Sequence, residues 1–246
     1  MRRTVRKNLL SFAVLLLAML SACGLFAQPW RSATARNVST DSVSTPLTVV
    51  IDAGHGGEDG GALNADGSIT EKEINLDVAL KLRDLLLLGG IPVVMTRTDD
   101  RMLYDPDSDF RGRKKQLDLA ARREIAEQTE NCLFVSIHMN SYPDPRYHGL
   151  QVWYSPNHPA SEATAKVVQE LVHELMQPEN NRHVKAAGSS IYLLHRLQIP
   201  AILVECGFLS NPEEAAKLNE ESYRENLAFL LFLSVLRAKE TVFAGG

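Results

Sequence analysis

Apolar runs of strand length alternate with helix-like segments along most of this chain, and this alternation restricts the fold more than any other feature. Strands and helices that follow one another in turn are typical of an α/β domain with a parallel sheet. Several of the runs are apolar almost throughout, as expected of strands that are buried on both faces. We therefore predict a single α/β domain with a twisted, mostly parallel β-sheet flanked by helices on both faces. The predicted strands are 47–54, 91–98, 132–140, 150–155 and 201–208.

The first predicted helix, 70–90, carries apolar residues at i, i+4 spacing from Ile74 to Leu86. Thr70 and Glu73 form a candidate capping box at its start. A later helix should begin at Asn211, with Pro212 in its first turn. The last helix has an apolar stretch that is too short to span a membrane, so we expect it to pack on the sheet. The helices after the first are predicted at 113–130, 160–177, 211–219 and 221–240.

The N-terminus has the pattern of an export signal rather than of a folded domain. A basic start is followed by an apolar stretch of about 14 residues. Residues 1–27 are interpreted as a signal peptide, a lipoprotein signal with Cys23 as the lipidated residue, or an uncleaved N-terminal anchor. All three alternatives place the domain outside the cytoplasm. Residues 28–46 are then a flexible tether, 47–240 the folded domain and 241–246 a tail.

Composition and charge fit a globular domain and argue against nucleic acid as a partner. The 246 residues are 45% apolar and 23% charged, with a net charge of −4, whereas a general nucleic-acid binder usually has a basic face. Two cysteines lie in the predicted domain, Cys132 at the start of one strand and Cys206 near the end of another. If these strands are parallel, the two cysteines lie about 20 Å apart along the strand direction. A disulfide needs Cα atoms within about 7 Å, so we predict two free, buried thiols.

Three side chains that could bind a metal or transfer protons lie at the ends of apolar runs. His55 comes after the first strand, His138 near the end of the third, and Glu205 near the end of the last. The carboxyl ends of parallel strands meet at one edge of a sheet, where the sites of such folds collect. Two imidazoles and a carboxylate suggest zinc, which usually has three protein ligands in catalytic sites. Spacing leaves the remaining acid open among Asp52, Glu58, Asp59, Glu71 and Glu73.

The glycines around His55 also admit a phosphate-binding interpretation. The stretch reads "AGHGGEDGG", which lacks the Lys-Ser/Thr of a P-loop and does not match G-x-G-x-x-G. We therefore prefer a different function for these glycines. They let the backbone turn tightly and bring His55 over the strand ends.

The sequence resembles the zinc-dependent N-acetylmuramoyl-L-alanine amidases of bacterial cell walls, the amidase-3 family. The resemblance covers 47–237 and rests on ordered motifs: "VVIDAGHGGEDGGA", "TEKEINLDVALKL", "VMTRTDD", "LFVSIHMNS", "GLQVWY" and "ILVECGFLSNPEEAAKL". It implies that His55, Glu71 and His138 bind one Zn²⁺ and that Glu205 is the catalytic glutamate. Among the acids left open by spacing, it favours Glu71. One departure, Glu127 after Ala126, lies away from these motifs.

Within that family the chain looks most similar to the spore-cortex, germination-specific type. The short N-terminal signal or anchor, the lack of an added wall-binding domain and the charged segment 99–125 carry this likeness. The implied reaction is hydrolysis of the amide between the lactyl group of N-acetylmuramic acid and L-alanine of the stem peptide. The implied role is cortex maturation with muramic δ-lactam formation, or other wall remodelling. The enzyme would be secreted, membrane-anchored or lipid-anchored, and in spores would lie in the intermembrane space.

Other expectations concern partners and additional contacts. Peptidoglycan is the expected substrate, and membrane attachment through the N-terminus and an activating protein partner are further expectations. Asn140 and His195 are candidate substrate contacts. The basic stretch 111–116 is interpreted as a solvated helix start, with binding of anionic wall polymers as the alternative. Rival functions are another zinc hydrolase acting on peptidoglycan, either a peptidase or a deacetylase, and a non-catalytic wall-binding module.

Overall fold

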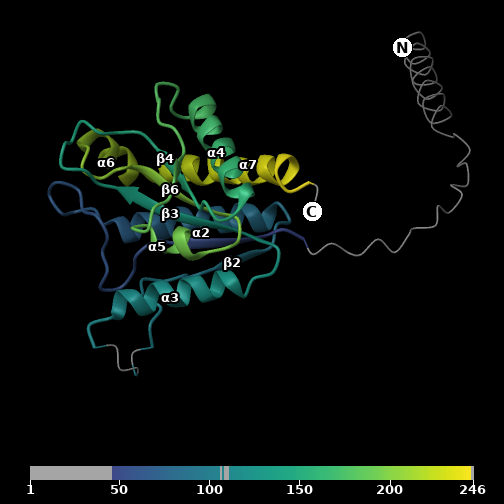
Figure 1. The fold of residues 1–246 in the computed structure, drawn as a ribbon. Helices are drawn as coiled ribbons and strands as arrows, with labels where there is room; N and C mark the ends of the chain where they lie inside the picture. Colours follow the sequence, from purple (N-terminus) through teal and green to yellow (C-terminus); the bar gives the residue numbers. More distant parts are fainter. Residues whose placement is uncertain (1–45, 106, 108–110, 245–246) are drawn as a thin grey trace, which may run out of the picture. The chain divides into compact units, whose positions relative to one another are not determined.

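Six strands form one twisted sheet in the order β2-β1-β3-β6-β4-β5 (Figure 1). The computed structural model describes residues 46–105, 107 and 111–244, so the predicted export signal and Cys23 lie outside the described residues. Neighbours among β2, β1, β3 and β6 are parallel, whereas β4 is antiparallel to β6. The prediction of a mostly parallel sheet is confirmed. The strands are β1 Thr48–Ala53, β2 Val93–Met95, β3 Cys132–Asn140, β4 Gln151–Tyr154, β5 Lys185–Ala186 and β6 Ala201–Phe208.

Two strands differ from the prediction. β2 has three residues. The amide of Thr96 still donates to Ile51 of β1, and beyond it the side chain of Arg97 bonds to β1 and to the loop that follows it. β5 was not predicted; it has two exposed residues and pairs only with β4. A strand this short gives no alternating pattern that sequence analysis could detect.

Helices cover both faces of the sheet, as predicted (Figure 1). One face packs on α2, α4 and α7 in a core cluster that includes Val49, Ile51, Val135 and Val204. The other face, with Val50, Phe134 and Leu203, packs on α3 and α5. The short helix α5 was not predicted. The helices are α2 Glu71–Leu88, α3 Lys114–Glu127, α4 Pro159–Leu175, α5 Tyr192–Arg196, α6 Pro212–Asn219 and α7 Glu221–Thr241.

The long C-terminal helix α7 packs as expected. Its apolar residues Leu227, Leu231 and Val235 are buried in the same core cluster as the strands, and α7 also contacts α2 and α4. The partly buried Phe243, just after α7, packs on this cluster too. None of the described helices combines the length and apolar character that crossing a membrane requires.

The two predicted helix starts have different outcomes. Asn211 caps α6, because its Oδ1 accepts bonds of 3.0 Å from the amides of Glu213 and Glu214. Thr70 makes no side-chain cap, so the predicted capping box is wrong; its hydroxyl donates to the Glu73 side chain instead. The first amides of α2 donate to carbonyls of the preceding glycine loop, which ties that loop to the helix.

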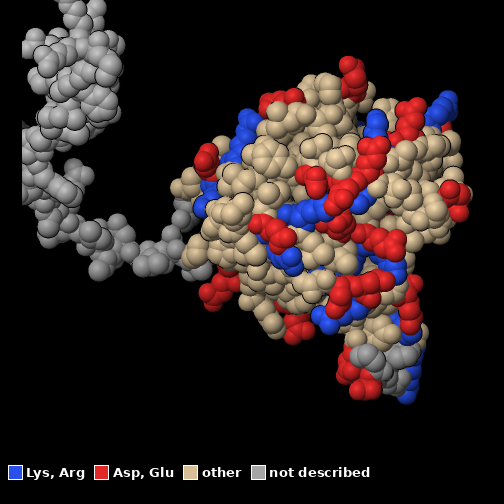
Figure 2. All heavy atoms as spheres, turned by 180° about the vertical axis from the view of Figure 1, so that it is seen from behind, with Lys and Arg blue, Asp and Glu red and all other residues tan. Residues whose placement is uncertain are grey.

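Cys132 and Cys206 are free and buried, as predicted. Phe134 is level with Ala201 in the parallel pair of β3 and β6, so the two cysteines lie at opposite ends of these strands. At the surface, Figure 2 shows basic and acidic side chains interspersed over the face that it displays.

Candidate active site

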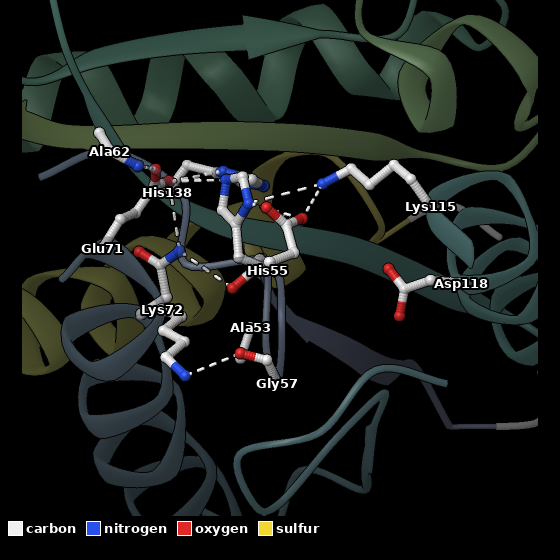
Figure 3. Close-up of polar contacts among 12 residues, drawn as sticks. Ala53, His55, Gly57, Ala62, Glu71, Lys72, Lys115, Asp118 and His138 are labelled. Atoms are coloured by element: carbon white, nitrogen blue, oxygen red, sulfur yellow. Dashed lines mark hydrogen bonds and ion pairs between the residues drawn. The ribbon is translucent and has the colours of Figure 1, made fainter. Parts of the chain in front are cut away.

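Three side chains from separate elements converge at the carboxyl ends of β1 and β3 (Figure 3). His55 follows β1, His138 lies on β3, and Glu71 is the first residue of α2. Glu71 Oε1 is 3.2 Å from His55 Nε2 and 2.8 Å from His138 Nδ1. The three candidate ligand atoms all lie within 4.8 Å of one another. Two nitrogens and one carboxylate oxygen are a ligand set of the kind that catalytic zinc takes.

The surroundings of this cluster fit a metal site. Glu71 is buried. Its Oε2 accepts a hydrogen bond of 2.7 Å from the amide of Ala62, and its Oε1 accepts one of 3.0 Å from the amide of Met139. These bonds fix the carboxylate in the manner of the outer contacts that orient metal ligands. Burial alone would raise the pKa of Glu71, but hydrogen bonds and charge from His138 and His55 lower it. A Cβ at Gly54 would stand 2.3 Å from the His138 ring, so only glycine leaves room for that imidazole.

The other acids that spacing left open lie elsewhere. Asp52 is buried under the cluster against Arg122, and Glu73 bonds Thr70 on the surface. Asp59 is closer, because its Oδ2 lies 2.9 Å from His55 Nδ1 and also pairs with Lys115. Burial alone would lower the pKa of His55, but the bonds with Asp59 and Glu71 raise it to about 9. The Asp59 contact occupies Nδ1 and leaves Nε2 directed at Glu71.

Glu205 lies on β6, directly level with His138 on β3. Its Oε2 atom is buried and has no hydrogen-bond partner among the residues that the structure describes. Burial raises the pKa of Glu205 to about 7; Glu71 acts in the same direction, and His138 and His55 act against it. A buried carboxylate oxygen without a partner, next to a cluster of candidate ligands, is typical of a reactive group.

Two buried arginines hold the backbone of the His55 loop, and sequence analysis did not identify either of them. Arg97 donates from Nε to the carbonyl of Ala53 at 2.8 Å and from Nη2 to that of Gly54 at 2.9 Å. Arg122 donates to the carbonyl of His55 at 2.6 Å and pairs with Asp52 at 2.7 Å. Both side chains are about as buried as core leucines, each 1% exposed. Arginine is usually exposed, so sequence gave no signal for this role.

The basic start of α3 contacts the same loop from outside. Lys114 pairs with Glu58 at 2.7 Å, and Lys115 pairs with Asp59. Figure 3 shows the Lys115 side chain extending toward His55. These lysines therefore bind acids of the glycine loop, which neither the solvated-helix interpretation nor the wall-polymer interpretation predicted.

The two candidate substrate contacts have different positions. Asn140 ends β3, two residues after His138 and at the same edge of the sheet. His195 is exposed on α5, and its carbonyl accepts a hydrogen bond from Asn157, which follows β4. The end of β4 pairs with the start of β6, so His195 lies toward the edge of the sheet opposite to the cluster. Asn140 therefore lies at the sheet edge that carries the cluster, where its Oδ1 accepts a bond from the amide of Ser141, whereas His195 lies away from that edge.

Comparisons with known proteins agree with this arrangement. A family model described as N-acetylmuramoyl-L-alanine amidase matches residues 49–236. The germination-specific N-acetylmuramoyl-L-alanine amidase of Bacillus subtilis (strain 168) is 34% identical over 206 residues, which are 82% of this chain and 85% of that protein.

Solved structures give the same result. The CwlD amidase from Clostridioides difficile, solved in complex with the GerS lipoprotein, is 39% identical with a TM-score of 0.75, over 78% of this chain and 98% of that one. The catalytic domain of CwlV from Bacillus (Paenibacillus) polymyxa var. colistinus is 30% identical with a TM-score of 0.66. The match covers 79% of this chain and 98% of that domain. Fold, motif order and these matches lead to one conclusion: the chain belongs to the N-acetylmuramoyl-L-alanine amidase family and is a peptidoglycan hydrolase.

Proposed function

We propose that this amidase is zinc-dependent, that His55, Glu71 and His138 bind a single Zn²⁺, and that residues 47–240 form the catalytic domain. The observation that carries the proposal is the convergence of His55 Nε2, Glu71 Oε1 and His138 Nδ1 beside the half-buried Glu205, whose Oε2 is buried. When bound there, zinc polarises the amide carbonyl and makes water a better nucleophile at neutral pH.

Glu205 performs the proton transfers of the reaction. Its Oε2 takes a proton from the attacking water and delivers it to the nitrogen of L-alanine, which is a poor leaving group until protonated. The amide bond to the lactyl carbonyl breaks, and the products are a lactyl carboxylate on N-acetylmuramic acid and a free L-alanine amine. Asn140, at the same edge, is proposed to contact the substrate.

Digestion of purified peptidoglycan tests the reaction. The full chain with Zn²⁺ should release new N-terminal L-alanine and leave the glycan intact, as measured by mass spectrometry, and a chelator should abolish this release. A deacetylase would release acetate, and a peptidase would free an amine other than that of L-alanine. Either of those products without free L-alanine would contradict the proposal.

Two substitutions separate the proposed roles. Glu205→Gln should retain zinc but lose activity by roughly 10²–10⁴-fold, the range of general acid–base catalysis. His55→Ala should lose both zinc and activity, because one of three ligands is removed. Metal content by atomic absorption and L-alanine release would be measured on the same samples. Glu205→Gln cleaving at the wild-type rate would exclude Glu205 as the base.

We also propose that the enzyme acts on the spore cortex from outside the cytoplasm. The likeness to a germination-specific amidase supports this role, and the sequence of residues 1–27 supports export by a signal peptide, a lipoprotein signal or an anchor. In a deletion strain the cortex should lack muramic δ-lactam. A normal δ-lactam content would favour general wall remodelling instead.

A protein partner is part of the same proposal. The similar CwlD amidase was solved with a lipoprotein, which supports a protein that binds and activates the present chain. Affinity purification of the tagged chain from sporulating cells, followed by an activity assay with and without the recovered protein, tests this. Full activity of the isolated chain, unchanged by that protein, would contradict it.

A further inference from the structure

A groove of about 600 Å³ lies at the starts of β4 and β5, one strand away from the proposed catalytic residue Glu205. Gln151 lines it and stands directly opposite Glu205 in the antiparallel pair of β4 and β6. Residues opposite each other in such a pair project to the same face of the sheet. Gln151 and Glu205 therefore lie on the same face of the sheet, and the groove at Gln151 is one strand away from Glu205.

Cationic side chains line this groove. Arg146, Arg182 and Lys185 face a single acid, Asp144, which already pairs with Arg146 at 2.7 Å. Within the described part of the chain, neither Arg182 nor Lys185 has a carboxylate at ion-pair distance. Elsewhere most lysines and arginines near the site are paired, so two cations without acids mark a place for an anionic ligand.

Arg182 is held in a fixed orientation. Its guanidinium stacks on Phe208 with 4.6 Å to the ring centroid, and Nε donates 2.7 Å to the carbonyl of His148. Nη1 donates 3.1 Å to Gln151 Oε1. Stacking and two hydrogen bonds orient a planar donor, and such guanidinium groups bind carboxylates with little loss of conformational entropy.

Lys185 adds a second positive charge at a suitable distance. Lys185 lies in β5 level with Trp153 of β4, and its Nζ is 5.4 Å from the centroid of that ring. β5 is two strand spacings from β6, about 10 Å across the sheet. An extended peptide advances about 3.5 Å per residue, so the second and third residues after the cleaved amide reach this part of the groove.

We propose that this groove, lined by Gln151, Arg182 and Lys185, binds the free carboxylates of the stem peptide. The inference rests on the proposed amidase reaction, because that reaction places the stem peptide beside Glu205. Peptidoglycan stems are acidic: the glutamate after L-alanine is joined through its γ-carboxyl and keeps its α-carboxylate, and the stem ends in a further carboxylate. The glycan has no comparable row of charges. The groove therefore selects substrates with acidic stems over amidated ones.

Peptide binding tests the groove without requiring turnover. The probe is L-Ala-γ-D-Glu-diaminopimelate, titrated calorimetrically into the full chain with Zn²⁺, beside the same peptide with its carboxylates amidated. Lys185→Gln should raise the Kd of the acidic peptide about three-fold to ten-fold, and Arg182→Gln should raise it about ten-fold or more. Lys239→Gln is the matched control, an exposed lysine beside Leu47 at the opposite end of the strands, and should change Kd less than about two-fold.

The outcomes separate this inference from the proposed reaction. Equal binding of the acidic and amidated peptides, or unchanged Kd in both Lys185→Gln and Arg182→Gln, would overturn the groove assignment, even in a chain that cleaves peptidoglycan normally. Binding of a peptide-free disaccharide that depends on Arg182 would assign the groove to glycan instead. Loss of acidic-peptide binding in both variants, in a chain that releases no L-alanine, would support the groove and contradict the reaction. Lys185 is exposed, so its variant tests the groove even if Arg182→Gln fails to fold.

Discussion

His55 adopts a backbone conformation that is unusual for a residue with a side chain. Its φ is 62°, in the left-handed region, which costs a residue other than glycine roughly 1–3 kcal/mol. The hydrogen bond from Arg122 to the His55 carbonyl helps to hold this conformation. The imidazole is therefore directed at Glu71 by the protein itself, so the proposed ligand set is preorganised.

Asp59 is predicted to be a positioning residue for His55. Asp59→Ala should weaken zinc binding by about 10–100-fold, because Nδ1 loses the acceptor that orients the ring. Glu58→Ala is the control: Glu58 is the preceding acid in the same loop but pairs with Lys114 on the surface, so its effect should stay within about two-fold. Competition with a chromophoric chelator measures both affinities. If both variants lose zinc affinity equally, the negative charge of the loop, rather than the orientation of His55, accounts for the effect.

Among the elements, β1, β3 and α3 meet in a buried polar network under the site. Burial alone would lower the pKa of Arg122, but Asp52 and Asp118 raise it, so the guanidinium stays charged. Ser136 on β3 donates 2.6 Å to Asp52, which satisfies the second oxygen of that carboxylate. The network fixes the carboxyl end of β1 and thereby the loop that carries His55.

Removing the cation from this network should be costly. Arg122→Met leaves two buried carboxylates without their partner, and we expect the free energy of unfolding to fall by about 3–5 kcal/mol. Arg123→Met changes the neighbouring residue, which is over a third exposed and pairs with Glu127, so its loss should be below about 1 kcal/mol. Urea unfolding followed by circular dichroism compares the two. Similar stability of both variants would show that the network is not needed for stability.

The packing of α2 against α7 has a pH-dependent component. Burial acts to raise the pKa of Asp77, but Arg224 and Lys81 lower it below its usual value. A lowered carboxylate pKa stabilises the folded state above the unfolded pKa of about 4, and this contribution is lost as pH falls through the lower folded pKa.

Arg224→Ala should therefore lower the free energy of unfolding by about 1 kcal/mol at pH 7. Below about pH 4 the variant and the wild type should differ less in this free energy. Some difference persists, because Arg224 also donates to the carbonyls of Leu218 and Asn219. Arg237→Ala, on the same helix with an exposed partner, should have less effect at either pH. Denaturant unfolding at pH 7 and pH 3 provides the measurement; a pH-independent loss would contradict the ion-pair contribution.

At the scale of the whole molecule, we expect the fold not to depend on the proposed metal site. The two apolar core clusters lie on the two faces of the sheet and contain neither His55, Glu71 nor His138. Chelation should therefore leave the secondary structure intact at 25 °C. A ligand at 100 times its Kd adds about 2.7 kcal/mol to stability, so chelation should lower Tm by roughly 5–10 °C. Unfolding on chelation, seen by circular dichroism, would instead make the metal structural.

Much of the fold and part of the site follow from local sequence. Apolar runs and helical spacing predicted five of the six strands and five of the six helices in the described residues, because burial imposes a period on each element separately. His138 and Glu205 stand at the ends of such runs, and parallel strands end at one edge, so sequence alone placed them together. Spacing could not choose among the five acids, and only the family resemblance favoured Glu71.

The tertiary structure decided what depends on contacts between distant segments. Arg97 and Arg122 are ordinary surface residues by type, and only the fold places the carbonyls of the His55 loop and Asp52 against them. The groove at Arg182 exists because β4 runs antiparallel beside β6 and brings Gln151 opposite Glu205. Local patterns determine which residues are buried in each element, whereas the partner of a buried charge is set by packing between elements that are far apart in the chain.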